Sequence, residues 1–200
     1  LAERVGLGER QLRRVFVDRL GVAPIGVHGT RRLLFAKQLL TETTLPITEV
    51  ALAAGFGSLR RFNATFLEAY RMAPRDLRRL PTAAQQGMLV LRLGYRPPYD
   101  FTAMLDFLRG RALPGVELVD EQSYARVVGP ALSPGWLRVG AWPDGEHALK
   151  LELRNVASTQ LLQIVNRLRR MFDLDADPHA IASSLSVDAR LIPLVKQRPG

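Results

Sequence analysis

Six basic or amide side chains in the first 80 residues have the chemistry needed to bind a nucleic acid. They are Arg10, Arg13, Arg14, Arg60, Arg61 and Asn63. A guanidinium group can donate two parallel hydrogen bonds to a guanine base or to a phosphate. The six residues form two clusters about fifty residues apart, so each cluster belongs to a different element.

An internal repeat positions the two clusters. Three apolar residues and a proline, spaced i, i+4, i+8 and i+12, recur fifty residues later: Leu12, Phe16, Leu20 and Pro24, then Phe62, Phe66, Tyr70 and Pro74. The first three positions place an apolar stripe along one helix, and the proline marks where the chain has turned away. A short apolar segment and a glycine-containing turn precede each stripe, at residues 1–8 and 47–58. The pattern predicts two helix-turn-helix units, with Phe16 and Phe66 as equivalent core residues and the second helix of each unit available to the DNA major groove.

A long helix is predicted between the two units. It spans residues 25–42, and its apolar side is formed by Leu33, Leu34, Ala36 and Leu40. With this helix, the string GFGS at residues 55–58 and the string APR at residues 73–75, residues 1–80 resemble the DNA-binding domain of the AraC/XylS regulators. The resemblance implies that the two recognition helices enter successive major grooves, with half-sites about one helical turn apart. The residue patterns alone leave open an all-α bundle with solvated arginines.

The second unit departs from the family pattern. Where the family often has a basic residue before the aromatic core positions of its second recognition helix, this chain has Ala64 and Thr65, and Leu59 lies near the helix start. We therefore expect the second unit to read bases less well than the first. The helix that precedes Leu1 in the family is absent, so we expect a fragment in which part of the first unit's core is exposed.

Charge and composition agree with a nucleic-acid partner for the first part of the chain. The formal net charge is +9, and residues 1–80 hold 14 basic and 7 acidic side chains, whereas residues 81–200 hold 14 and 12. A basic surface attracts a polyanion because neutralised phosphates release their counterions. The chain has no cysteine and only three scattered histidines, so we expect no metal and no cofactor. No apolar run approaches the roughly 20 residues that span a bilayer, so no membrane partner is expected.

The periodicity changes after residues 81–87, which we interpret as a linker. Strands are predicted at residues 88–93, 117–119, 124–128, 136–142 and 148–153, and helices at residues 99–109 and 160–171. This order predicts an α+β domain with an antiparallel sheet. No phosphate-binding loop, nucleophile elbow or catalytic carboxylate pair is apparent. Asp173, Asp175 and Asp177 alternate as in a calcium loop, but the glycine and terminal glutamate of such a loop are missing.

Several separated strings in this half carry a second resemblance. They are RPPYDF at residues 96–101, ML at 104–105, FL at 107–108, YAR at 124–126, RLRRMFDL at 167–174 and DP at 177–178. In this order and spacing, residues 85–185 resemble the N-terminal, TBP-like domain of bacterial DNA-3-methyladenine glycosylase II. Fusion of this domain to the regulator module resembles the Ada-type adaptive-response proteins, in which a methyl-accepting domain can precede the module.

The glycosylase resemblance assigns no catalytic residue to this chain. In the family, the catalytic aspartate belongs to a helix-hairpin-helix domain, and we interpret residues 181–200 as the truncated start of that domain. We expect domains at residues 1–80 and 88–180. The resemblance assigns one site residue here: Phe107, which would line the pocket for a flipped alkylated base. The alternative for Phe107 is an ordinary core position beside Leu108.

These observations predict a DNA-binding regulator coupled to the repair of alkylated DNA. The expected partners are double-stranded DNA, alkylated or not, and RNA polymerase, in the bacterial cytoplasm. One alternative is an AraC/XylS transcription factor whose second half senses a small ligand, although such sensor domains usually precede the helix-turn-helix pair. Another is a structural interaction module without affinity for DNA.

Overall fold

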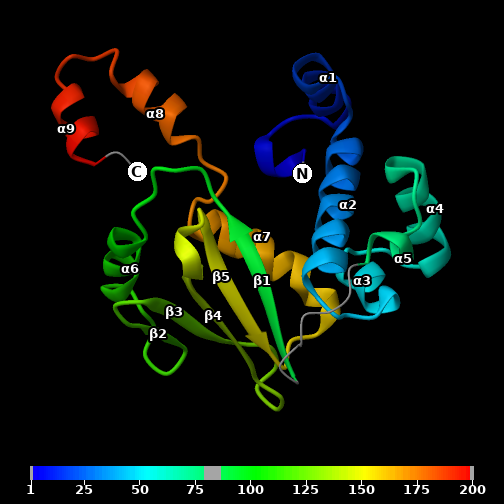
Figure 1. Cartoon of the computed structure of the whole chain (residues 1–200). Helices are drawn as coiled ribbons and strands as arrows, with labels where there is room; N and C mark the ends of the chain where they lie inside the picture. The colour runs from blue at the N-terminus through cyan, green and yellow to red at the C-terminus, as the bar shows by residue number, and fades with distance from the viewer. Residues whose placement is uncertain (1, 79–86, 199–200) are drawn as a thin grey trace. The chain divides into compact units, whose positions relative to one another are not determined.

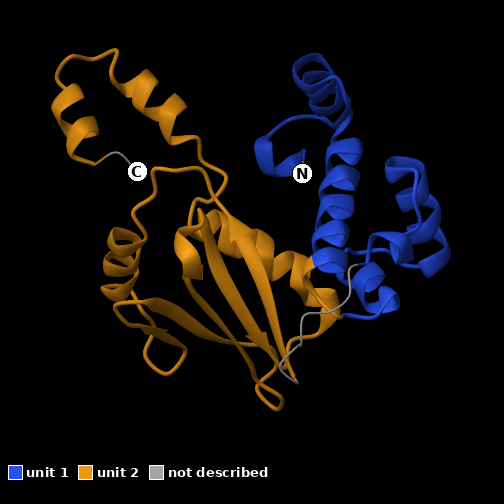
Figure 2. Cartoon of the chain, in the orientation of Figure 1, with its two compact units in different colours: residues 1–41, 45–79 blue, residues 42–44, 80–200 orange. Residues whose placement is uncertain are grey.

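A computed structural model describes residues 2–78 and 87–198, so most of the predicted linker lies outside the described residues. The chain divides into two compact units, which Figure 2 shows in different colours. The first comprises residues 1–41 and 45–79, and the second comprises residues 42–44 and 80–200. No helix among the described residues is long and apolar enough to cross a membrane.

The first unit contains two helix-turn-helix pairs joined by one long helix (Figure 1). Its elements are a 3-10 turn at Glu3–Val5, α1 at Glu9–Leu20, α2 at Pro24–Glu42, α3 at Ile47–Ala53, α4 at Leu59–Tyr70 and α5 at Pro74–Leu77. The long helix α2 is the one predicted between the units. In the first pair, the segment before α1 forms only the single 3-10 turn, and none of its residues is buried.

Aromatic rings form the core of the second pair. The ring centroids of Phe56 and Phe62 are 5.1 Å apart, those of Phe62 and Phe66 are 5.5 Å apart, and those of Phe66 and Tyr70 are 4.6 Å apart. Phe62 and Phe66 are fully buried. Edge-to-face and tilted ring pairs at these distances add to the hydrophobic gain of burial.

The core of the first pair is much less complete. Leu12 is buried, but Phe16 is only half-buried and Leu20 is 58% exposed. The prediction that Phe16 and Phe66 are equivalent core residues is therefore wrong as regards burial. The physical reason is that the turn at Glu3–Val5 covers little of α1, whereas α3 supplies the buried residues Val50, Ala51 and Ala53 beside α4.

The buried side of α2 also differs in part from the prediction. Phe35, Ala36, Leu39 and Leu40 are buried, which confirms the two predicted positions 36 and 40. Leu34, by contrast, is 54% exposed. The apolar residues of α2 occur on more than one side of the helix, so their pattern alone could not select the side that becomes buried.

The second unit is a five-stranded antiparallel sheet with helices, as predicted. Its strands are β1 at Met88–Gly94, β2 at Glu117–Val119, β3 at Ser123–Val128, β4 at Gly135–Ala141 and β5 at Ala148–Arg154, in the order β1-β5-β4-β3-β2. Side chains alternate along β1 and β5, and the register pairs the buried Leu91 with Leu151 and Leu93 with Leu149. A sheet with one buried face needs helices to cover that face.

Two helices pack against the sheet, α6 at Phe101–Arg109 and α7 at Leu161–Met171. Two more helices, α8 at Pro178–Leu185 and α9 at Ile192–Gln197, follow them and have no buried residue. The residues of α7 that are buried, Leu161, Val165 and Leu168, recur on one side of the helix. Phe172, which follows α7, is fully buried, with its ring centroid 5.9 Å from that of Tyr124 on β3. The core of the second unit therefore lies between one face of the sheet and its helices.

Candidate nucleic-acid interface

The six predicted DNA-binding side chains all lie on the solvent side of α1 or α4. Leu12 and Phe62 are the buried residues that set the phase of the two helices. Because each residue turns an α-helix by about 100°, the positions one or two residues from a buried residue point away from the core. The six residues are exposed: Arg10, Arg13, Arg14, Arg60, Arg61 and Asn63.

These side chains are also free to bind a partner. Within the part of the chain that the structure describes, none of the six side chains forms a hydrogen bond or an ion pair with another residue. A phosphate or a base would therefore not have to compete with an internal carboxylate for these guanidinium groups. The first unit thus brings together cations in the arrangement that a polyanion requires.

Arg32 on α2 is a functional residue that sequence reasoning missed. Its Nε donates a hydrogen bond of 2.8 Å to the carbonyl of Ala54, and its guanidinium donates a second, of 2.5 Å, to the carbonyl of Gly55. The same guanidinium stacks on the ring of Phe56, 4.0 Å from the centroid. Arg32 thereby fixes the end of α3 and the turn that leads into α4. No local pattern could reveal a contact between residues 22 positions apart.

The surroundings of Arg32 also change the pKa of its guanidinium group. Burial lowers the pKa of Arg32, because desolvation disfavours the charged form, and the nearby cation Arg61 lowers it further. Arginine nevertheless stays protonated at neutral pH. The turn before α4 therefore keeps a fixed positive charge close to Arg61.

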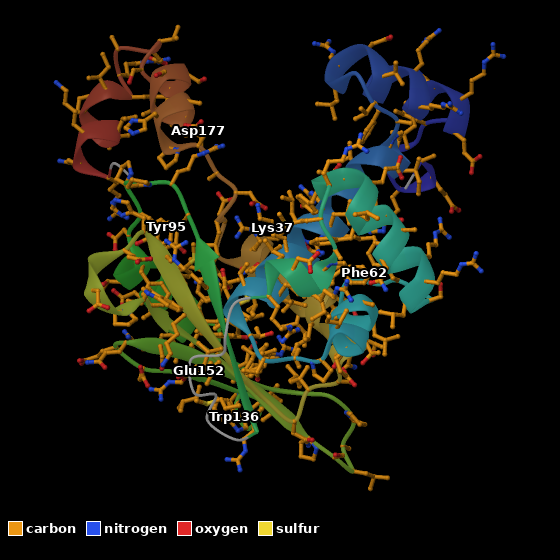
Figure 3. The ribbon with its side chains drawn as sticks, turned by 45° about the vertical axis from the view of Figure 1, so that its right-hand side comes forward. Lys37, Phe62, Tyr95, Trp136, Glu152 and Asp177 are labelled. Atoms are coloured by element: carbon orange, nitrogen blue, oxygen red, sulfur yellow. The ribbon has the colours of Figure 1, made fainter. Side chains whose placement is uncertain are left out.

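Three further contacts hold the second helix-turn-helix pair. The Nζ atom of Lys37 on α2 lies 5.4 Å from the ring centroid of Tyr70, and Figure 3 labels Lys37 and Phe62 on their helices. Arg78 donates a hydrogen bond to the carbonyl of Leu45. Ser58 caps α4 by accepting a hydrogen bond of 3.2 Å from the backbone N–H of Arg61.

Phe107 of the second unit lines a cleft of about 510 Å³ and is 54% exposed. The core position of α6 is instead Leu105, which is buried, so Phe107 is not an ordinary core residue. Met104 and Met171 line the same cleft, together with Ile181. Most of the residues that line the cleft are apolar, so the cleft suits a planar ligand that is desolvated when it binds.

Beside this cleft, the string at residues 96–101 contacts two of the other strings that carry the glycosylase resemblance, at residues 167–174 and 177–178. Arg96 pairs with Asp177 at 3.3 Å, and the hydroxyl of Tyr99 donates a hydrogen bond of 2.8 Å to the carbonyl of Phe172. Burial is the main cause that raises the pKa of Tyr99. Asp177 also caps α8, and Asp175 pairs with Arg169 at 2.6 Å. Two of the three alternating aspartates therefore serve in ion pairs.

One face of the Phe107 ring is already covered. The guanidinium of Arg111 lies 3.8 Å from the ring centroid, and its Nη1 donates a hydrogen bond of 2.9 Å to the carbonyl of Phe107. A planar ligand would therefore stack on the opposite face of the ring. The role of Phe107 in a base pocket stays a prediction.

Family models match both units. Residues 1–80 match a helix-turn-helix domain, and residues 90–200 match the AlkA N-terminal domain. The chain belongs to the AlkA N-terminal domain family. These matches confirm both resemblances stated above.

Three relatives cover the chain in different ways. The "Probable bifunctional transcriptional activator/DNA repair enzyme AlkA" of Mycobacterium tuberculosis is 34% identical over 206 residues, 100% of this chain and 41% of the relative. The "HTH-type transcriptional regulator GbdR" of Pseudomonas aeruginosa is 38% identical over 45% of this chain and 24% of the relative. The "DNA-3-methyladenine glycosylase 2" of Escherichia coli is 34% identical over 46% of this chain and 33% of the relative. The chain therefore aligns over its whole length with the relative from Mycobacterium tuberculosis, but it spans only about two fifths of the length of that relative.

Proposed function

We propose that this chain is the DNA-binding part of a protein that couples transcriptional regulation to the repair of alkylated DNA. The observation that carries the proposal is the pair of matched helices α1 and α4, whose six exposed basic and amide side chains have no internal partner among the described residues. The whole-length match to a relative described as a bifunctional activator and repair enzyme supports the coupling.

Each recognition helix would place its first two turns in a major groove of double-stranded DNA. Arg13 and Arg14 would contact bases or phosphates from α1, and Arg60, Arg61 and Asn63 would do so from α4. An activator acts through RNA polymerase, so that enzyme is the second partner of this proposal, and both partners belong to the cytoplasm. Double-stranded DNA is the substrate that both functions share.

Phe107 would provide one wall of a pocket for an alkylated base that has been flipped out of the duplex. Its exposure, the apolar cleft beside it and the free face of its ring support this role. No residue of this chain is assigned to bond cleavage. The developing sugar cation needs a carboxylate, which the family resemblance places in the helix-hairpin-helix domain.

DNA binding is tested by fluorescence anisotropy on mixed-sequence duplexes. We expect the double variant Arg13→Ala/Arg14→Ala to lose about 1–3 kcal/mol of binding free energy for each base contact, or about one unit of salt slope for each phosphate contact. Arg19→Ala is the control for loss of a cation from the same helix, because Arg19 lies on the side of Leu12. Equal affinity and equal salt dependence of the double variant and the original chain, with circular dichroism unchanged, would contradict the proposal.

Repair is tested by the release of 3-methyladenine and 7-methylguanine from alkylated DNA. We expect no release by the 200-residue chain and clear release by a longer protein that adds the proposed helix-hairpin-helix domain after it. Phe107→Ala in that longer protein should reduce release with little effect on binding to undamaged duplexes. Inactivity of the longer protein, or release by the short chain at a similar rate, would refute the repair assignment.

A further inference from the structure

The helices α1 and α4 match position for position but differ in the chemistry of their exposed sides. Both contain 12 residues, and the offset between matching positions is fifty. At the positions that flank the buried residue, Arg13 corresponds to Asn63 and Arg14 corresponds to Ala64. All four residues are exposed, so the difference lies on the surface and not in the core.

The exposed ridge of α4 begins with Arg60 and is apolar beyond the first turn. Phe62 and Phe66 are fully buried and define the inner side of the helix. Ala64 lies two residues from each of them, which at about 100° per residue places it almost opposite the core. Leu67, one turn further along, is 51% exposed. Asn63 lies beside this ridge, and the cations Arg60 and Arg61 are confined to the first turn.

The same ridge on α1 carries one more cation. Arg14 occupies the position of Ala64, whereas Arg10 matches Arg60 one turn earlier and the exposed Val17 matches Leu67. The second halves of the two helices agree, because Asp18 and Glu68 occupy matching exposed positions. An acidic residue there keeps phosphates away, so the first two turns of each helix are the parts that can approach DNA.

We propose that the two helices select different base pairs, with α1 taking a half-site that contains G·C pairs and α4 taking a half-site of A·T pairs. Asn63 would bond the N6 and N7 atoms of adenine, and Ala64 would contact a thymine methyl group. Arg13 and Arg14 would bond O6 and N7 of guanine. This inference rests on the proposed function, since it assumes that both helices enter major grooves.

The chemistry of the major groove supports the assignment. Bidentate contacts join arginine to guanine and asparagine to adenine, and apolar side chains contact the thymine methyl group. Ala64 cannot bind a phosphate, so a helix that only contacted the DNA backbone would gain nothing from it. Its exposure instead places an apolar methyl group next to an amide that is free to pair with a base.

Selection from duplexes with a randomised central region tests the proposal. We expect enriched sites with a G-containing segment and an A·T segment whose centres are about one helical turn apart. Asn63→Arg/Ala64→Arg gives α4 the residues of α1 and should shift the A·T segment toward G·C. Arg13→Asn/Arg14→Ala is the reciprocal exchange and should shift the other segment toward A·T. Ala69→Arg is the control for added charge: it places one cation on another side of α4 and should leave the selected sequence unchanged.

A second measurement isolates the thymine contact. Replacing thymidine by deoxyuridine in the A·T segment removes only the methyl groups, and should weaken binding of the original chain but not of Asn63→Arg/Ala64→Arg. Asn63→Ala should reduce the preference for adenine by about ten-fold to a hundred-fold, the range of one good bidentate pair.

The failure of this inference can be distinguished from the failure of the proposed function. Binding with a selected G-containing segment and a random or G·C second segment would overturn the inference and leave the proposed function standing. Equal affinity for thymidine and deoxyuridine duplexes would overturn the thymine contact. Absence of binding to every duplex would overturn both.

Discussion

The two helix-turn-helix pairs of the first unit have the same spacing but differ in how they are held together. The second pair has four aromatic rings in contact, an arginine that bonds two carbonyls of its turn, and a serine cap on α4. The first pair has one buried residue on α1, Leu12, and the capping position before α1 is Gly8, which has no side chain to cap the helix. A repeat of apolar positions therefore predicts the same backbone without predicting the same stability.

The first pair, which is packed less completely, has more positive charge on the exposed side of its recognition helix. The exposed side of α1 presents Arg10, Arg13 and Arg14, whereas that of α4 presents Arg60 and Arg61 in its first turn and the neutral Asn63 and Ala64 after it. The less tightly packed pair is thus the better electrostatic match for DNA. Stability and DNA attraction are concentrated in different copies of the same motif.

Removing one phenylalanine ring from each pair is expected to give the largest difference in stability between the two pairs. We expect Phe66→Ala to lower the free energy of unfolding by about 3–5 kcal/mol, the usual cost of truncating a fully buried phenylalanine. Phe16→Ala should cost clearly less, because its ring is half-buried and leaves a smaller cavity. Chemical denaturation of the 200-residue chain, followed by the helical circular dichroism signal, gives both values. Equal losses for the two variants would show that the pairs are equally well packed.

Arg32 provides the next largest test. We expect Arg32→Lys to destabilise the second pair by about 1–3 kcal/mol, because lysine keeps the charge but cannot bond both carbonyls from one planar group. Arg31→Lys is the matched control, since Arg31 is the exposed neighbour on α2. Amide exchange in α3 and α4 would report the effect. Unchanged exchange in Arg32→Lys would mean that the aromatic core holds the turn by itself.

Regular apolar spacing explains why much of the fold could be predicted. The stripes headed by Leu12 and Phe62 set the phase of α1 and α4, and alternation along residues 88–94 and 148–154 set the sheet. The helices α8 and α9 were not predicted, because α8 has no buried residue and therefore no clear apolar side. The spacing of apolar residues predicts a helix only where one side of that helix is buried. The prediction therefore fails for helices with little buried surface.

The candidate site was predictable only in its exposed residues. The six basic and amide side chains could be placed because they flank buried positions of a repeated motif. Arg32 could not, because its partners lie 22 and 23 residues away and the contact depends on how α2 packs against the turn. The covering of Phe107 by Arg111 joins residues one helical turn apart, a spacing that could have been noticed.

The smallest expected effect concerns the caps of the two recognition helices. Ser58 accepts a hydrogen bond from the third residue of α4, Arg61, whereas Gly8 in the matching position has no side chain to offer. Gly8 has an extended backbone with φ −70° and ψ 151°, and a Cβ added there would meet no atom within 4 Å. We therefore expect Gly8→Ser to stabilise α1 by a few tenths of a kcal/mol, and Ser58→Gly to weaken α4 by a similar amount, about the difference between serine and glycine caps.

Amide hydrogen exchange resolves changes of this size, because it reports local opening residue by residue. In Gly8→Ser, the amide of Gln11 corresponds to that of Arg61 and should exchange more slowly, while amides of α4 stay unchanged. In Ser58→Gly, the amide of Arg61 should exchange faster, while those of α1 stay unchanged. Slower exchange throughout both helices in Gly8→Ser would show that the two pairs open together, and the contrast in their stability would then belong to the unit as a whole. Local changes in each variant would establish that the weak cap is one cause of the looser first pair, separate from its incomplete core.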